Sequence, residues 1–129
     1  MSEAGKPEPQ PASVPRAASV SSQMTLDDFQ RLTLRIGTVV AAQNHPNADR
    51  LLILSVDLGE ETPRQVVAGI RGSYEATQLV GRQVVVVANM KPAMLRGVES
   101  QGMILAASQG SEIVLVGPDR PIAAGSTVK

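Results

Sequence analysis

Apolar residues alternate with polar or small ones in the stretch Leu32-Thr33-Leu34-Arg35-Ile36-Gly37. Because successive side chains of a β-strand point to opposite faces, this alternation predicts a half-buried strand over residues 32–42. The pattern predicts that Arg35 points outward. Gly37 has no side chain, and it could permit the bend that a strand makes in a small barrel.

Further strands are predicted on the C-terminal side of this stretch. Apolar and β-branched runs at 51–58, 64–70 and 83–89 predict three of them, and 101–108 with 112–116 supply the last strands. Residues 73–80 predict a short helix before Gly81, and residues 43–50 and 90–99 predict loops. This order predicts an all-β chain: a five-stranded OB-fold (oligonucleotide-binding) barrel with a short helix between strands 3 and 4 and a C-terminal β extension.

The chain divides by composition into a tail and one domain. Residues 1–23 carry four of the nine prolines and no sustained apolar periodicity, which predicts a disordered tail or linker. The OB-fold domain is expected over 24–129, and at its entrance Thr25 can cap a short helix with Asp28 three residues later. A second, catalytic domain does not fit in 129 residues.

Residue counts exclude several kinds of chemistry. The absence of cysteine excludes disulfides, thiolate zinc sites and cysteine nucleophiles, and a single histidine, His45, excludes a two-histidine metal site. His45 is interpreted as a turn residue, and no metal, cofactor or catalytic residue is expected. No apolar run approaches the roughly 20 residues of a membrane span, and no secretory signal is evident, so we expect a cytoplasmic location without membrane partners.

Charge and aromatic content limit how the chain could bind a nucleic acid. Twelve basic and twelve acidic side chains cancel, so a binding site must be a local patch. The aromatic side chains are Phe29 and Tyr74, too few to stack each base of a single strand. A folded RNA, recognised by shape and backbone, fits better. In an OB fold the ligand lies on strands 2 and 3 between two loops, which correspond here to 43–50 and 90–99.

Four segments resemble a known family, the tRNA-binding domain family. They are His45–Leu51, Arg64–Ile70, Ala88–Pro92 and Glu99–Ala107, and the resemblance extends over residues 24–129. The family includes the C-terminal domain of bacterial methionyl-tRNA synthetases, free-standing dimeric tRNA-binding proteins, a bacterial secretion chaperone and the cytokine-like domain of animal synthetase complexes. The sequence departs from the family pattern at Arg50, where many members carry lysine, and at Ala76-Thr77, where a Pro-Glu pair is expected.

The resemblance implies non-catalytic binding of tRNA and a set of contact residues. Basic side chains would neutralise phosphates, three polar ones would bond to sugar hydroxyls or base edges, and a methionine would supply an apolar contact. By position the resemblance puts Arg35, Asn47 and Arg50 on one side of a cleft, Asn89 and Lys91 on the other, and Ser100 and Met103 on its floor. The predicted tRNA-binding residues are Arg35, Asn47, Arg50, Asn89, Lys91, Arg96, Ser100 and Met103. Four further arginines are interpreted as surface charges: Arg31, Arg64, Arg71 and Arg82.

Partners and alternatives follow from the rest of the chain. The apolar stretches 113–116 and 121–124 exceed what a five-stranded barrel must bury, which favours a homodimer. The resemblance also implies the methionyl-tRNA synthetase catalytic chain as a partner. One alternative is an export-related chaperone of the same fold that binds unfolded polypeptide. A second is an enzyme using Asp57, Glu60 and Glu61, but these carboxylates lie at a polar turn without a partner base.

Overall fold

The computed structural model describes residues 22–129 and divides the chain into two units, Met1–Arg31 and Leu32–Lys129. The described part of the first unit contains helix α2, Leu26–Gln30. The Thr25 hydroxyl accepts a hydrogen bond from the Asp28 backbone N–H at 3.0 Å, and the Asp28 carboxylate accepts one from the Thr25 N–H at 3.4 Å. The expected helix cap is therefore confirmed. The expected tail, apart from its last two residues, lies outside the described residues.

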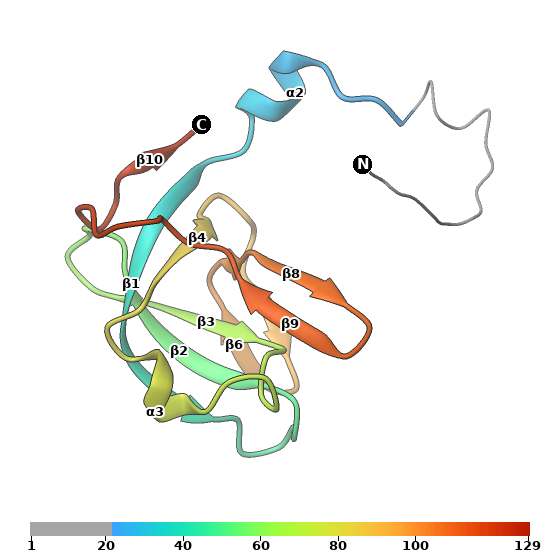
Figure 1. The fold of residues 1–129 in the computed structure, drawn as a ribbon, viewed down its shortest axis with the longest axis vertical. Coiled ribbons are helices and arrows are strands. Elements are labelled where there is room, and N and C mark those ends of the chain that lie inside the picture. The colour runs from blue at the N-terminus through green and yellow to red at the C-terminus, as the bar shows by residue number, and fades with distance from the viewer. Residues whose placement is uncertain (1–21) are drawn as a thin grey trace. The chain divides into compact units, whose positions relative to one another are not determined.

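The second unit is a nearly closed antiparallel barrel, as predicted (Figure 1). Its strands lie in the order β3-β2-β1-β4-β7, and β10 pairs with the start of β1. The short helix α3, Ala76–Leu79, lies between β3 and β4 in the chain. The bounds are β1 Leu34–Asn44, β2 Leu52–Asp57, β3 Arg64–Ala68, β4 Gln83–Val87, β7 Met103–Ile104 and β10 Thr127–Val128.

Two hairpins extend from the barrel and differ from what the sequence predicted. The expected loop 90–99 contains the hairpin of β5, Ala93–Leu95, and β6, Val98–Ser100. The expected strand 101–108 is divided into β7 and β8, Ala106–Gln109, and β8 pairs with β9, Glu112–Leu115. At the division the Leu105 N–H donates to Val85 of β4 while its carbonyl accepts from Val116, so the chain changes partners there. Among the described residues no helix is long and apolar enough to span a membrane.

The first half of β1 buries residues on both faces, whereas the sequence predicted a half-buried strand with Leu34 and Ile36 inside. Gly37 and Val39 lie on the inner side, where Val39 packs in the barrel core with β2, β3 and β4 residues. Leu34 and Ile36 instead pack on the outside of the barrel, in a cluster formed by Leu34, Ile36, Val85 and Val87 with Leu105 and Val128 against it. Arg35 pairs with Val86, a core residue, and so shares the inner side at one end of the barrel. The prediction that Arg35 points outward is wrong, because Leu34 and Ile36 occupy the outer side, where Leu105 and Val128 pack against them.

Gly37 is required by close packing inside the barrel rather than by a bend alone. A Cβ atom at this position would overlap Val56 Cγ1 and lie 3.0 Å from side-chain atoms of Leu58 and Val86. These three residues are buried in the core, so none can move without disturbing other contacts.

We expect Gly37→Ala to lower the free energy of unfolding by about 1–3 kcal/mol, the usual effect of overpacking a core. Urea denaturation followed by circular dichroism measures this change. Gly69→Ala is the matched control, because its Cβ would lie 3.7 Å from Leu51 Cδ2, an ordinary contact. Equal stabilities of the two variants would show that Gly37 is not packed as described.

Candidate nucleic-acid interface

The barrel closes through side-chain and backbone hydrogen bonds between β3 and residues 100–101 at the end of β6. The Gln101 N–H donates to the Gln65 carbonyl at 2.7 Å, and the Gln101 side-chain oxygen accepts from the Gln65 N–H at 2.9 Å. The Ser100 hydroxyl accepts from the Val67 N–H at 3.0 Å and donates to the Gly102 carbonyl at 2.8 Å. Ser100 is 4% exposed. Its hydroxyl therefore joins two parts of the barrel.

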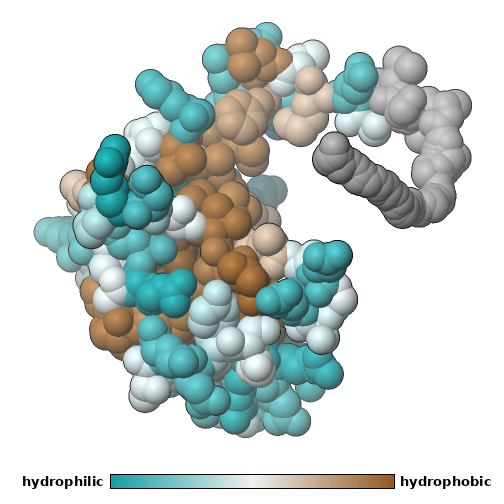
Figure 2. Space-filling model, in the orientation of Figure 1, coloured by the Kyte–Doolittle hydropathy of each residue, from teal (hydrophilic) through white to brown (hydrophobic). Residues whose placement is uncertain are grey.

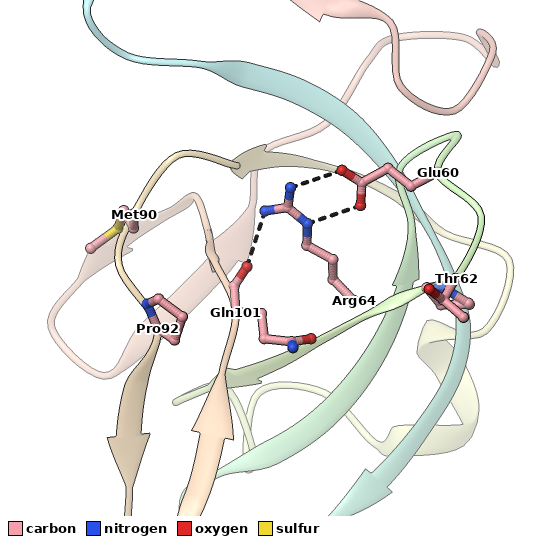
Figure 3. Close-up of a pocket in the computed structure, with 7 residues that line it drawn as sticks. Glu60, Thr62, Arg64, Met90, Pro92 and Gln101 are labelled. Atoms are coloured by element: carbon pink, nitrogen blue, oxygen red, sulfur yellow. Dashed lines mark hydrogen bonds and ion pairs between the residues drawn. The ribbon is translucent and has the colours of Figure 1, made fainter.

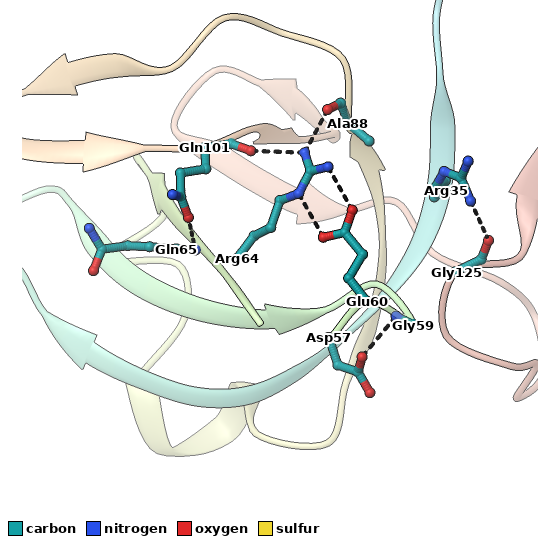
Figure 4. Close-up of polar contacts among 9 residues, drawn as sticks. All are labelled: Arg35, Asp57, Gly59, Glu60, Arg64, Gln65, Ala88, Gln101 and Gly125. Carbon is teal, nitrogen blue, oxygen red and sulfur yellow. Dashed lines mark hydrogen bonds and ion pairs between the residues drawn. The ribbon is translucent and has the colours of Figure 1, made fainter. Parts of the chain in front are cut away.

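Arg64 reinforces this closure at the start of β3 (Figure 4). Its guanidinium donates two hydrogen bonds to the Glu60 carboxylate, at 3.0 and 2.8 Å. It also donates to the Ala88 carbonyl at 2.6 Å and to the Gln101 carbonyl at 3.2 Å. Arg64 was interpreted as a surface charge, but it joins the end of β4 to the closing segment.

The Arg64–Glu60 pair shifts the pKa of both groups. The hydrogen bond from Arg64 holds the pKa of Glu60 below its ordinary value, although partial burial opposes this, and the positive charges of Arg64 and Arg35 lower it further. The same hydrogen bond raises the pKa of Arg64. Because the Glu60 pKa is lowered by folding, the stabilisation is present above the unfolded pKa and is lost as pH falls through the folded pKa. The pair is partly exposed, so its contribution is small.

A polar hollow of about 370 Å³ lies beside this pair (Figure 3). Its lining includes Glu60, Arg64, Met90, Pro92 and Gln101. Lys91 lies between two of these residues in the chain. The Asn89 side-chain oxygen accepts from the Thr33 N–H at 2.9 Å, and Arg35 donates to the Gly125 carbonyl at 3.3 Å. Asn89 and Arg35 thus bond to residues near the start and the end of the barrel unit, Thr33 and Gly125.

His45 joins the two predicted loops at the other end of β1. Its Nδ1 accepts a hydrogen bond from the Asn47 N–H at 2.9 Å, and its Nε2 lies 3.0 Å from the Leu95 carbonyl oxygen. A backbone N–H can only donate and a carbonyl can only accept, so this geometry fits the neutral imidazole with its proton on Nε2. His45 is 3% exposed. It was interpreted as a turn residue, but it fixes the β5–β6 hairpin against the β1–β2 loop.

The tip of this hairpin carries Arg96 in a strained conformation. Arg96 has φ 54° and Gly97 φ 88°, the pair of positive values that a two-residue turn between β-strands uses. A left-handed conformation costs a residue with a side chain about 1–2 kcal/mol relative to its ordinary one. Arginine is not favoured there for conformational reasons, so the strain fits a role for the guanidinium.

An apolar hollow of about 340 Å³ is lined by residues of β3, β7, the β8–β9 hairpin and the end of β5. Met103, one of the predicted contact residues, lines it and is 46% exposed. Leu51 follows the β1–β2 loop and Leu95 precedes the hairpin tip, and both also line it. The apolar hollow is thus bordered by both predicted loops.

The predicted site residues fall into two groups. Asn47, Arg50, Arg96 and Met103 lie around the β1–β2 loop, the hairpin and the apolar hollow. Asn89 and Lys91 flank Met90 of the polar hollow, and the charge of Arg35 acts on Glu60 in its wall. Arg35 is near the start of β1, whereas Asn47 follows its end. The expected placement of Arg35 beside Asn47 and Arg50 is therefore wrong. Ser100 lies between the groups, in the closure.

Comparison with known sequences identifies related proteins. Residues 34–127 match the family described as "Putative tRNA binding domain". The chain is 45% identical over 106 residues to a methionine–tRNA ligase of Thermococcus kodakarensis, covering 82% of this chain and 14% of the ligase. It is 52% identical over 107 residues to that of Deinococcus radiodurans, covering 82% of this chain and 16% of the ligase. The chain thus spans about a seventh of the length of these relatives.

Solved structures share the fold over most of the chain. A MetRS related protein from Pyrococcus horikoshii superposes with a TM-score of 0.78 and 29% identity, covering 84% of this chain and 99% of that one. The chaperone CsaA from Bacillus anthracis superposes with a TM-score of 0.76 and 30% identity, covering 84% of this chain and all of that one.

The two hydrogen bonds of His45 can be separated by substitution. In His45→Asn the amide oxygen can accept from Asn47 as Nδ1 does, but the shorter side chain cannot reach Leu95. In His45→Gln the amide nitrogen can occupy the place of Nε2 and donate to Leu95. We expect His45→Asn, and not His45→Gln, to speed amide hydrogen exchange in β5 and β6, and to lower the unfolding free energy by about 1–3 kcal/mol.

Hydrogen exchange followed by mass spectrometry over residues 93–100 measures this difference. Unchanged exchange in His45→Asn would show that the hairpin does not depend on His45.

Proposed function

We propose that this chain, which belongs to the tRNA-binding domain family, binds folded tRNA as a non-catalytic module appended to, or acting beside, methionyl-tRNA synthetase. The related sequences are methionine–tRNA ligases of which the matching region is a small part. The observation that carries the proposal is the contact of His45 with Leu95, since it brings two loops with exposed cationic side chains to one side of the barrel.

In this proposal RNA contacts the group of residues around the β1–β2 loop and the β5–β6 hairpin, which are Asn47, Arg50, Arg96 and Met103. Arg50 and Arg96 neutralise phosphates, and Asn47 bonds to a sugar hydroxyl or base edge. Met103 supplies apolar contact from the border of the hollow. The chain has a formal net charge of zero, so attraction to RNA comes from this local patch rather than from the whole molecule. Contacts with the backbone would position tRNA without reading its sequence.

The remaining predicted residues contribute in two other ways. Arg35, Asn89 and Lys91 offer a second contact towards the polar hollow, which a ligand as large as tRNA can span. Ser100 contributes indirectly, through the hydrogen bonds that close the barrel, because its buried hydroxyl is already bonded to Val67 and Gly102. Ser100→Ala should therefore weaken tRNA binding by disturbing the neighbouring Met103, without unfolding the domain.

We also propose a cytoplasmic homodimer. Figure 2 shows apolar side chains gathered over β1, β4 and the chain between β9 and β10. Val114, Val116 and Ile122 are 49%, 40% and 52% exposed. A second copy would cover this apolar face, and two copies together would offer a larger surface for one tRNA.

A second candidate function is binding of unfolded polypeptide. The similarity to the chaperone CsaA and the apolar lining of the hollow support this alternative. Cationic loops fit RNA better, because a polypeptide chain in general carries no dense negative charge. Competition between tRNA and an unfolded polypeptide distinguishes the two candidates.

We expect Arg50→Ala to lower affinity for total tRNA on the order of tenfold, the effect of losing one hydrogen-bonded charge. It should also reduce the salt dependence of binding by about one phosphate contact. Wild-type affinity should fall on the order of tenfold or more from low to high salt, because phosphate contacts release counterions. Fluorescence anisotropy with labelled tRNA across a salt series measures all three.

The control is Arg82→Ala, which removes the same charge at α3's end, where the guanidinium lies 5.6 Å from the Tyr74 ring centroid. Equal loss of affinity in both variants, or binding that salt does not affect, would contradict the assigned patch.

For the dimer, light scattering after gel filtration should give twice the monomer mass at micromolar concentration, and Ile122→Glu should shift it to the monomer. A charged residue in an apolar interface lacks a partner and is costly to bury. A wild-type monomer at that concentration would contradict the proposal.

A further inference from the structure

Three exposed arginines adjoin the lining of the apolar hollow in the chain. Its lining residues Leu51, Ile70 and Leu95 are each the immediate chain neighbour of an exposed arginine: Arg50, Arg71 and Arg96. The Arg71 N–H donates to the Arg50 carbonyl at 3.2 Å, which holds two of these segments together. His45 bonds to the Leu95 carbonyl and positions the third.

The lining itself carries no charge. Apart from the hydroxyl of Ser108, the described residues that line the hollow are apolar, among them Val67, Gly69, Met103 and Ile113. The polar hollow differs in this respect, because Glu60 and Arg64 form part of its wall and bond to each other. An apolar floor with exposed arginines next to its lining residues in the chain suits a ligand with a flat apolar part and an adjoining anion.

We propose that the apolar hollow receives the base of one unstacked nucleotide of the RNA, while the arginines next to its lining residues bind the adjoining phosphates. This inference rests on the proposed function and adds to it a base-binding site. The volume of about 340 Å³ falls within the range of ligand pockets, which begins at about 300 Å³. RNA-binding proteins commonly take bases that are splayed out of single-stranded loops or ends.

The hollow offers a base an aliphatic surface, where single-strand-binding proteins commonly offer an aromatic one. Tyr74 is the one aromatic residue of the barrel unit, and its hydroxyl accepts from the Leu115 N–H at 3.1 Å, so it belongs to the packing beneath β9. Met103 offers a flexible, polarisable thioether to the face of a base. Since apolar contact distinguishes bases weakly, the site would accept different bases, in agreement with sequence-tolerant binding.

Gly69 provides a way to fill the hollow without straining the backbone. It is exposed, its φ lies outside the left-handed region, and a Cβ there would make only an ordinary contact at 3.7 Å with Leu51. Gly69→Leu therefore places an apolar side chain where the base would lie. Thr77→Leu on the exposed face of α3 is the control, because it adds apolar area away from the hollow.

The first test uses the wild-type protein and two oligonucleotides. One is a single-stranded ribotrinucleotide, and the other has the same backbone with an abasic central position. We expect the abasic trinucleotide to bind on the order of tenfold more weakly, the usual effect of losing one base contact. Equal binding of the two would overturn the base site, because the arginines alone would then hold the ligand.

The second test uses tRNA and the two leucine variants, with their thermal unfolding checked first. Gly69→Leu should weaken tRNA binding on the order of tenfold, and Thr77→Leu should leave it unchanged. Tight tRNA binding unaffected by Gly69→Leu overturns the base site but leaves the proposed function standing. Absence of tRNA binding by the wild type overturns both. Loss in Gly69→Leu of binding to an unfolded apolar polypeptide, with tRNA binding unchanged, overturns the base site in favour of a peptide.

Discussion

The structure depends on how the backbone hydrogen-bonding groups at the edge of β3 find partners. A barrel has no free edge only if its first and last strands bond to each other, yet β3 meets the segment 99–102 through side chains as well as backbone groups. Ser100, Gln101 and Arg64 supply the missing hydrogen bonds. Because the β5–β6 hairpin leads into this segment, the closure also sets where the hairpin ends and where Met103 lies beside the apolar hollow.

The interface is then shaped by a contact at the far end of the hairpin. His45 bonds to the Leu95 carbonyl and fixes the strained Arg96 turn near the β1–β2 loop. In the binding mode proposed above, the backbone at Arg50 and Arg96 would need little ordering because the hairpin is held at both ends, which would reduce the entropy lost on binding. A protein of zero formal net charge can in this way present a local cationic surface.

The sequence predicted the barrel strands and the capped helix before them because their signals are local. The β-branched run 83–89, the turn formers at 43–50 and the Thr25 cap each depend on residues close in the chain. Arg35 was assigned to the wrong face because Leu34 is covered by Val128, far away in sequence. The roles of His45 and Arg64 were missed because they bond to the carbonyls of Leu95, Ala88 and Gln101, and a carbonyl is present in every residue. The position of the single histidine in a segment that resembles the family, His45–Leu51, was the one signal that the sequence offered.

The most direct test of the account is amide hydrogen exchange of the wild-type protein with and without saturating tRNA. We expect slower exchange in residues 45–51 and 93–97 and around Met103, the surfaces that His45 and the barrel closure bring together. Protection confined to the outer face of β1 and β4, with the loop and the hairpin unchanged, would contradict it.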